Sequence, residues 1–89
     1  MKTAKQMERH FKGIANHWRI NILLLVKKNP EITLDGIVGA LKGNFKTISE
    51  HTRKLVQAGL LNKKYLGRNV TNSLSPYGER IVDFIKIFK

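Results

Sequence analysis

The sequence contains no cysteine and only six acidic residues. The lack of cysteine excludes disulfide bridges, thiolate metal ligands and thiol nucleophiles. The longest unbroken apolar run, residues 22–26, is far too short to cross a bilayer. The first twelve residues show no apolar core of a secretory signal. We therefore expect a cytoplasmic protein that does not enter a membrane.

The sequence also offers few candidate catalytic residues. Its 89 residues predict one small domain spanning 1–89, without a separate sensing domain. The few carboxylates are scattered along the sequence. Ser49 and His51 are two positions apart on a predicted helix, so they do not face each other, and no carboxylate is placed to orient the histidine. We expect no enzymatic activity and no cofactor.

Positive charge is what the chain has in excess. Seventeen Lys and Arg give a formal net charge of +11 and an isoelectric point near 10.4. Residues 42–68 carry seven of these cations against a single acid, Glu50. Clustering of this kind is typical of a surface that faces phosphates, so nucleic acid is the favoured partner, bound in the nucleoid. An anionic membrane surface and simple solubility are the alternatives.

The pattern of apolar residues and of Gly and Pro predicts the element order α-α-α-α-β-β-α, mainly helical with one small β-hairpin. The expected helices are 4–16, 17–28, 33–42, 44–58 and 76–89, and the expected strands are 61–66 and 70–75, joined by 67–69. Thr33 and Asn44 are expected N-caps, and Gly59 an expected helix stop. This order is the winged helix-turn-helix plan, with the wing at about 61–75.

The predicted helix 44–58 has two different faces. Phe45, Ile48, Thr52, Leu55 and Val56 form one stripe that predicts a core seam. The other side is polar and basic. Together with the hairpin cations, it predicts a DNA-contacting set: Lys42, Asn44, Lys46, Thr47, Ser49, Glu50, His51, Arg53, Lys54, Lys63, Lys64 and Arg68.

The terminal helices carry more apolar surface than one core face needs. In the last helix, Val82 and Ile87 fall outside the main apolar stripe. We expect the excess to pack against a second copy of the chain through Met7, Phe11, Ile81, Phe84, Ile85 and Phe88. The alternative is that the last helix packs across the first helix of its own chain.

Three segments resemble the ArsR/SmtB-like winged helix-turn-helix regulators. "IANHWRINIL" (14–23) resembles the start of that family's core helix, "KTISEHTRKLVQAGLL" (46–61) its recognition helix, and "LGRNVTNSLSPYG" (66–78) its wing. The resemblance covers about residues 10–80. It implies a DNA-binding homodimer paired through its outer helices, and by analogy a repressor.

Many members of that family sense metal ions, but this sequence departs from their ligand patterns. The cysteine pair near the third helix is replaced by "EITLDGI" (31–37), and the last helix has no histidine. His10, His17 and His51 fall one per helix and do not form a local ligand set; His10 and His17 are expected at the surface or in caps. We expect no metal site and no metal effector.

In this binding mode Lys46 contacts guanine acceptors, and Thr47 contacts either a thymine methyl group or a phosphate. Arg53 and Lys54 contact phosphates, and Arg68 contacts the backbone or minor groove. Glu50 either accepts a hydrogen bond from a cytosine amino group or orients a neighbouring cation. A non-specific, architectural DNA-binding protein and a protein-interaction module of the same fold are the alternative functions.

Overall fold

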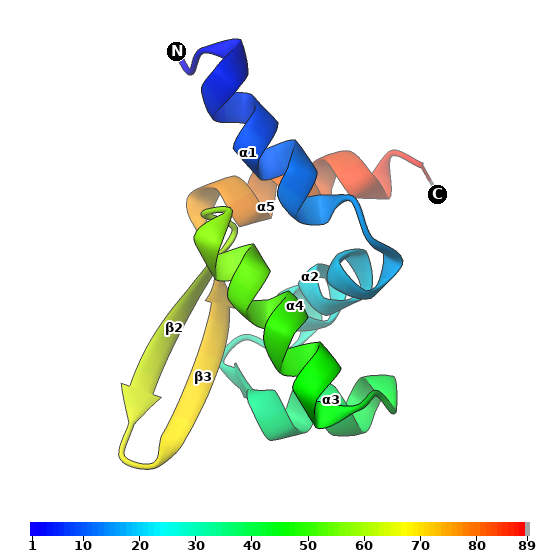
Figure 1. Cartoon of the computed structure of the whole chain (residues 1–89), viewed down its shortest axis with the longest axis vertical. Helices are drawn as coiled ribbons and strands as arrows, with labels where there is room; N and C mark the ends of the chain where they lie inside the picture. The colour runs from blue at the N-terminus through cyan, green and yellow to red at the C-terminus, as the bar shows by residue number, and fades with distance from the viewer. Residues whose placement is uncertain (89) are drawn as a thin grey trace.

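The computed structural model describes residues 1–88, and their order of elements follows the predicted one with a single addition (Figure 1). The helices are α1 (Ala4–Ile14), α2 (His17–Lys28), α3 (Leu34–Leu41), α4 (Phe45–Gln57) and α5 (Pro76–Lys86). The strands are β1 (Ile32–Thr33), β2 (Leu61–Leu66) and β3 (Asn69–Leu74). The winged helix-turn-helix prediction is confirmed.

Side-chain caps set where the helices begin. The Asn44 side chain accepts a hydrogen bond from the Thr47 amide at 3.2 Å, and Thr33 accepts one from the Gly36 amide at 3.0 Å. Both caps were predicted, because Asn and Thr satisfy amides that have no partner within the helix. The Asn16 side chain caps α2 in the same way, so α1 ends at Ile14 rather than at the predicted 16.

The strand β1 was not predicted. Ile32 and Thr33 pair antiparallel with Asn72 and Thr71, so the sheet has three strands in the order β1-β3-β2. The side-chain amide of Asn72 adds a hydrogen bond to the Ile32 carbonyl oxygen at 3.2 Å. Two residues are too few to show a strand period, so only the pairing across the fold reveals this strand.

The hairpin turn is tighter than predicted. Leu66 pairs directly with Asn69, which leaves Gly67 and Arg68 as a two-residue turn and starts β3 at Asn69 instead of 70. Gly67 has a φ of +63°, a conformation that glycine adopts without steric cost, whereas Arg68 does not have a positive φ. This order of angles is the type II′ pattern, which suits the twist of a hairpin.

The core is built around α2, which packs against α1, α3, α4 and α5 and against β3. Ile22, Leu23 and Val26 are essentially fully buried, together with Ile37, Ile48, Leu55, Leu60, Leu61 and Val82. No helix within residues 1–88 has both the length and the apolar content that crossing a membrane requires.

Two predicted core positions are wrong. Val82 was placed outside the apolar stripe of the last helix, yet it is fully buried, because α5 crosses α2 and β3 with Gly78 and Val82 facing inward. A Cβ atom at Gly78 would come within 2.1 Å of the Leu60 carbonyl oxygen. Phe45 was placed in the core seam, yet its exposed fraction is 54%, because it is the first residue of α4 and lies beside the wing tip.

Candidate nucleic-acid interface

The helix α4 is anchored on one face and open on the other. Ile48, Thr52 and Leu55 are buried, and the Thr52 hydroxyl donates to the Ile48 carbonyl oxygen at 2.8 Å, so this polar residue is satisfied inside the core seam. The opposite face is exposed and consists of Lys46, Thr47, Glu50, Arg53, Lys54 and Gln57. Six polar side chains without an apolar member therefore form one outward surface.

The only acid on that surface is paired. The Arg53 Nε donates to Glu50 Oε2 at 3.3 Å, and the Arg53 Nη2 contacts the other carboxylate oxygen. The hydrogen bond with Arg53 lowers the pKa of Glu50 and raises that of Arg53. Glu50 therefore contacts Arg53 in this structure, and both roles proposed for it toward DNA stay predictions.

Ser49 and His51 lie at the edges of the outward surface and are half-buried. The Arg19 Nε of α2 donates to His51 Nδ1 at 3.3 Å. Burial, followed by the nearby Arg19 charge, lowers the pKa of His51. A neutral His51 that accepts at Nδ1 carries its proton on Nε2, so the ring offers one N–H donor on its other side.

The wing, which is the β2–β3 hairpin of residues 61–74, is exposed along almost all of β2. Lys63 and Lys64 are neighbours on a strand and therefore point to opposite faces of the sheet, so they do not form one patch. Arg68 at the turn lies beside Phe45 in a shallow hollow of about 170 Å³. The wing tip thus approaches the N-terminal end of α4, where Lys46 and Thr47 are.

Lys42 and Asn44 lie at the start of α4. Lys42 is exposed and ends α3 in the left-handed conformation, with a φ of +53°. Asn44 uses its side-chain oxygen as the cap of α4. That oxygen already accepts one hydrogen bond, so Asn44 positions the first turn of the helix.

The three histidines do not come together. Within residues 1–88 no group of three His, Asp or Glu side chains is close enough to hold a metal ion. His10 was expected at the surface or in a cap, and this is wrong: its exposed fraction is 5%, and its Nδ1 donates to the Ala58 carbonyl oxygen at 2.6 Å. The sequence offered no signal for this contact, because the two residues are 48 positions apart.

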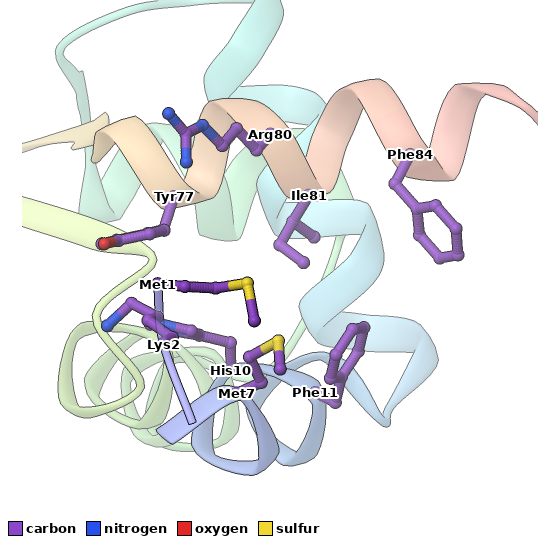
Figure 2. A pocket seen from close by; sticks show the side chains of 9 residues that line it. All are labelled: Met1, Lys2, Met7, His10, Phe11, Tyr77, Arg80, Ile81 and Phe84. Atoms are coloured by element: carbon purple, nitrogen blue, oxygen red, sulfur yellow. The ribbon is translucent and has the colours of Figure 1, made fainter. Parts of the chain in front are cut away.

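Four of the six predicted dimer residues line a groove between α1 and α5: Met7, Phe11, Ile81 and Phe84. Met7, Phe11 and Phe84 have exposed fractions of 38, 50 and 45%. With Ile81, Tyr77 and the aliphatic parts of neighbouring side chains they surround a pocket of about 420 Å³ (Figure 2). Phe88 is 77% exposed, and Ile85 is half-buried. The helix α5 packs on α2 and β3 and contacts α1 through the stacking of Tyr77 on His10, while Phe11 and Phe84 stay exposed.

Comparison with solved structures identifies the architecture. HlyU from Vibrio cholerae superposes with a TM-score of 0.88 and 22% sequence identity, over 98% of this chain and 95% of that one. The winged helix-turn-helix domain of Mb0332 from Mycobacterium bovis, described as homodimeric and as a possible ArsR-family transcriptional regulator, gives 0.85 and 24%, over 94% and 78%. The transcriptional repressor PagR of Bacillus anthracis gives 0.83 and 22%, over 91% and 93%.

The chain has the winged-helix fold. No protein-family model and no curated protein matches the sequence. At these identities the likeness establishes the architecture, and the resemblance to ArsR-type regulators read from the motifs is confirmed at that level.

Proposed function

We propose that this protein is a sequence-specific, double-stranded-DNA-binding transcriptional regulator that acts as a repressor. The observation that carries the proposal is the outward surface of α4. It is exposed and polar, and it has two unpaired lysines, Lys46 and Lys54, among its described contacts, while its only acid is bound to Arg53. The B-DNA major groove is wide enough to admit such a helix.

The proposed binding mode follows from the positions on α4. Lys46 and Thr47 lie in the first turn and meet base edges in the major groove. Arg53 and Lys54 lie in the later turns and meet phosphates. Arg68 at the wing tip reaches the backbone or the adjacent minor groove, because it stands beside the start of the same helix. Phosphate contacts position the protein, and base contacts specify the sequence.

The active form is proposed to be a homodimer. The groove between α1 and α5 presents Met7, Phe11, Ile81 and Phe84, and the exposed ring of Phe88 packs edge-on against that of Phe84. Apolar surface of this kind is normally covered by a partner. The Mb0332 domain of the same fold is described as homodimeric. A two-fold dimer places two α4 helices against successive major grooves, about 34 Å apart.

One observation favours the architectural alternative. An acid on a purely phosphate-binding face would serve no purpose, yet Glu50 here has a partner in Arg53 and holds it in place. The presence of Glu50 therefore does not by itself require base recognition. The same surface is compatible with a protein that coats DNA of any sequence.

Salt titrations on a selected DNA duplex and on a random one test the regulatory function and the architectural function. Genomic fragments retained by the protein are sequenced, and affinities for an enriched and a random duplex are measured by fluorescence anisotropy. We expect steep salt dependence, with a log–log slope of about −0.9 for each phosphate contacted, and a preference for the enriched site of about 10³-fold or more. A binding curve that is flat from low to physiological salt would contradict DNA binding. Equal affinity for both duplexes would support the architectural function.

A further inference from the structure

A cationic hollow lies between α1, α2 and α4. Its volume is about 330 Å³, and four of its seven lining residues are cations: Arg9, Lys12, Arg19 and Lys54, with Gly13, Gln57 and Ala58 completing the wall. No acid lines it. Arg9, Lys12 and Arg19 belong to the consecutive helices α1 and α2, whereas Lys54 belongs to α4, so the packing of α4 on these two helices completes the cluster.

The hollow lies on the opposite side of α4 from the wing. Lys54 lines the hollow and Phe45 lies beside Arg68 of the wing. The two residues are nine positions apart, which at about 100° per residue puts them on opposite sides of the helix. Between them on the exposed side are Arg53 and Gln57, whereas the buried Leu55 lies between them on the inner side. The outward surface of α4 is therefore flanked by cations on both sides.

Arg19 of α2 connects the end of α1 to α4 at the hollow. Its Nη1 donates to the carbonyl oxygens of Lys12 and Gly13 at 3.4 and 3.2 Å, and its Nε donates to His51 at 3.3 Å. A guanidinium has five N–H donors, and these bonds use the one on Nε and the two on Nη1. The two donors on Nη2 have no partner among the described contacts. They remain able to donate to phosphate oxygens.

Arg9 and Lys12, which were not among the predicted DNA contacts, complete the surface of the hollow. The guanidinium of Arg9 lies over the turn after α4, where a Cβ added to Gly59 would meet its Nη2 at 2.9 Å. Lys12 forms a 3.0 Å ion pair with Glu8, and both side chains are well exposed. An exposed pair of this type contributes little free energy, so a phosphate can replace Glu8 at little cost.

We propose that this hollow, formed by Arg9, Lys12, Arg19 and Lys54, is a second phosphate-binding surface for the DNA duplex. It grips the backbone on the side of α4 away from the wing, with Arg19 as its fixed donor. The inference rests on the proposed function. It adds contacts from α1 and α2 to a footprint that the sequence assigned only to α4 and the wing.

The test is a matched pair of double variants. Arg9→Gln/Lys12→Gln removes two charges from the hollow. Lys28→Gln/Lys86→Gln removes two exposed charges elsewhere, so the net charge of the two proteins is equal. Salt titrations on a random duplex should show the log–log slope of the hollow variant reduced by about 1 to 2. The control slope should stay close to that of the wild type. Equal slopes in both variants would overturn the proposal.

The side chain of Arg19 gives a second readout without substitution at that position. On addition of the random duplex, the ¹⁵N–¹H signal of the Arg19 Nε should shift and sharpen in the wild type. The response should be weaker in Arg9→Gln/Lys12→Gln. An Arg19 signal unchanged by saturating duplex would also overturn the phosphate surface. If the wild type binds no DNA at all, the proposed function fails as a whole; if it binds with unaltered slopes in the hollow variant, only this surface fails.

Discussion

The imidazole Nδ1 of His10 donates a hydrogen bond to the carbonyl oxygen of Ala58, 2.6 Å away, and so ties α1 to the C-terminal end of α4. A carbonyl oxygen can only accept, so the proton is on the ring nitrogen. The same ring stacks on Tyr77 of α5, with 4.8 Å between the ring centroids. One side chain thus connects the two helices proposed to pair in the dimer with the helix proposed to enter the groove.

The first prediction concerns that connection. His10→Ala removes a buried ring and leaves the Ala58 carbonyl without its partner, so it should lower the free energy of unfolding by about 2–4 kcal/mol. Chemical denaturation measures this change. Lys5→Ala, at an exposed position of the same helix, is the control and should change stability by less than about 0.5 kcal/mol. A His10→Ala protein as stable as the control would show that the contact is not needed.

The second prediction uses two glycines. A Cβ at Gly13 would lie 2.4 Å from the Ala58 Cβ, whereas a Cβ at Gly39 would meet nothing within 4 Å. Gly13→Ala must push α1 away from α4 and should destabilise the protein by about 1–3 kcal/mol. Gly39→Ala, in the exposed middle of α3, should stabilise it by about 0.5–1 kcal/mol because alanine favours the helix. Melting temperatures that move in the same direction for both would contradict this packing.

The third prediction is a pH dependence. The pKa of His51 is lowered from its usual value near 6.5, so below that pH the unfolded chain takes up the proton first. The stability from neutral His51 should therefore be complete above about 6.5 and decline as the pH falls below it. His51→Gln should flatten this part of the stability profile. Lys28→Gln is the control, because Lys28 is exposed and is not among the charges that shift the His51 pKa. Identical profiles for wild type and His51→Gln would contradict the assignment.

The fourth prediction separates base reading from phosphate contact. Lys46→Ala should cost about 1–3 kcal/mol on the enriched site and much less on random DNA, because it removes a base contact. Arg68→Ala should weaken binding to both duplexes equally and reduce the salt slope by about one. Competition titrations with the two duplexes measure both effects. Equal losses for both variants on every sequence would favour the architectural function.

The fifth prediction concerns the dimer. Phe84 is 45% exposed in the groove between α1 and α5, so Phe84→Glu should abolish association while the monomer remains folded. Sedimentation velocity at micromolar concentration reports the oligomeric state, and circular dichroism reports the fold. Lys86→Glu, two positions further on α5 and exposed, should remain dimeric. A wild-type monomer at this concentration would refute the homodimer.

The local structure of this protein was readable from its sequence. Asn44, Thr33 and Gly59 end or begin elements where they were expected to, because caps and left-handed stops depend on a few consecutive residues. The seam through Ile48 and Leu55 was also predictable, since a helix repeats every 3.6 residues. The outward polar face of α4 follows from the same period.

Only the tertiary structure decided how these pieces meet. The strand β1 exists because Ile32 reaches Asn72, and Val82 is buried because α5 crosses α2, which no periodicity reports. The contacts of His10 with Ala58 and of Arg19 with His51 join residues 48 and 32 positions apart. Local propensity is set by neighbours along the chain, whereas burial, hydrogen-bond partners and charge clusters are set by which elements pack together. The amino-acid order therefore determined the elements and the excess of positive charge, and the packing of α1 and α2 on α4 decided where that charge gathers.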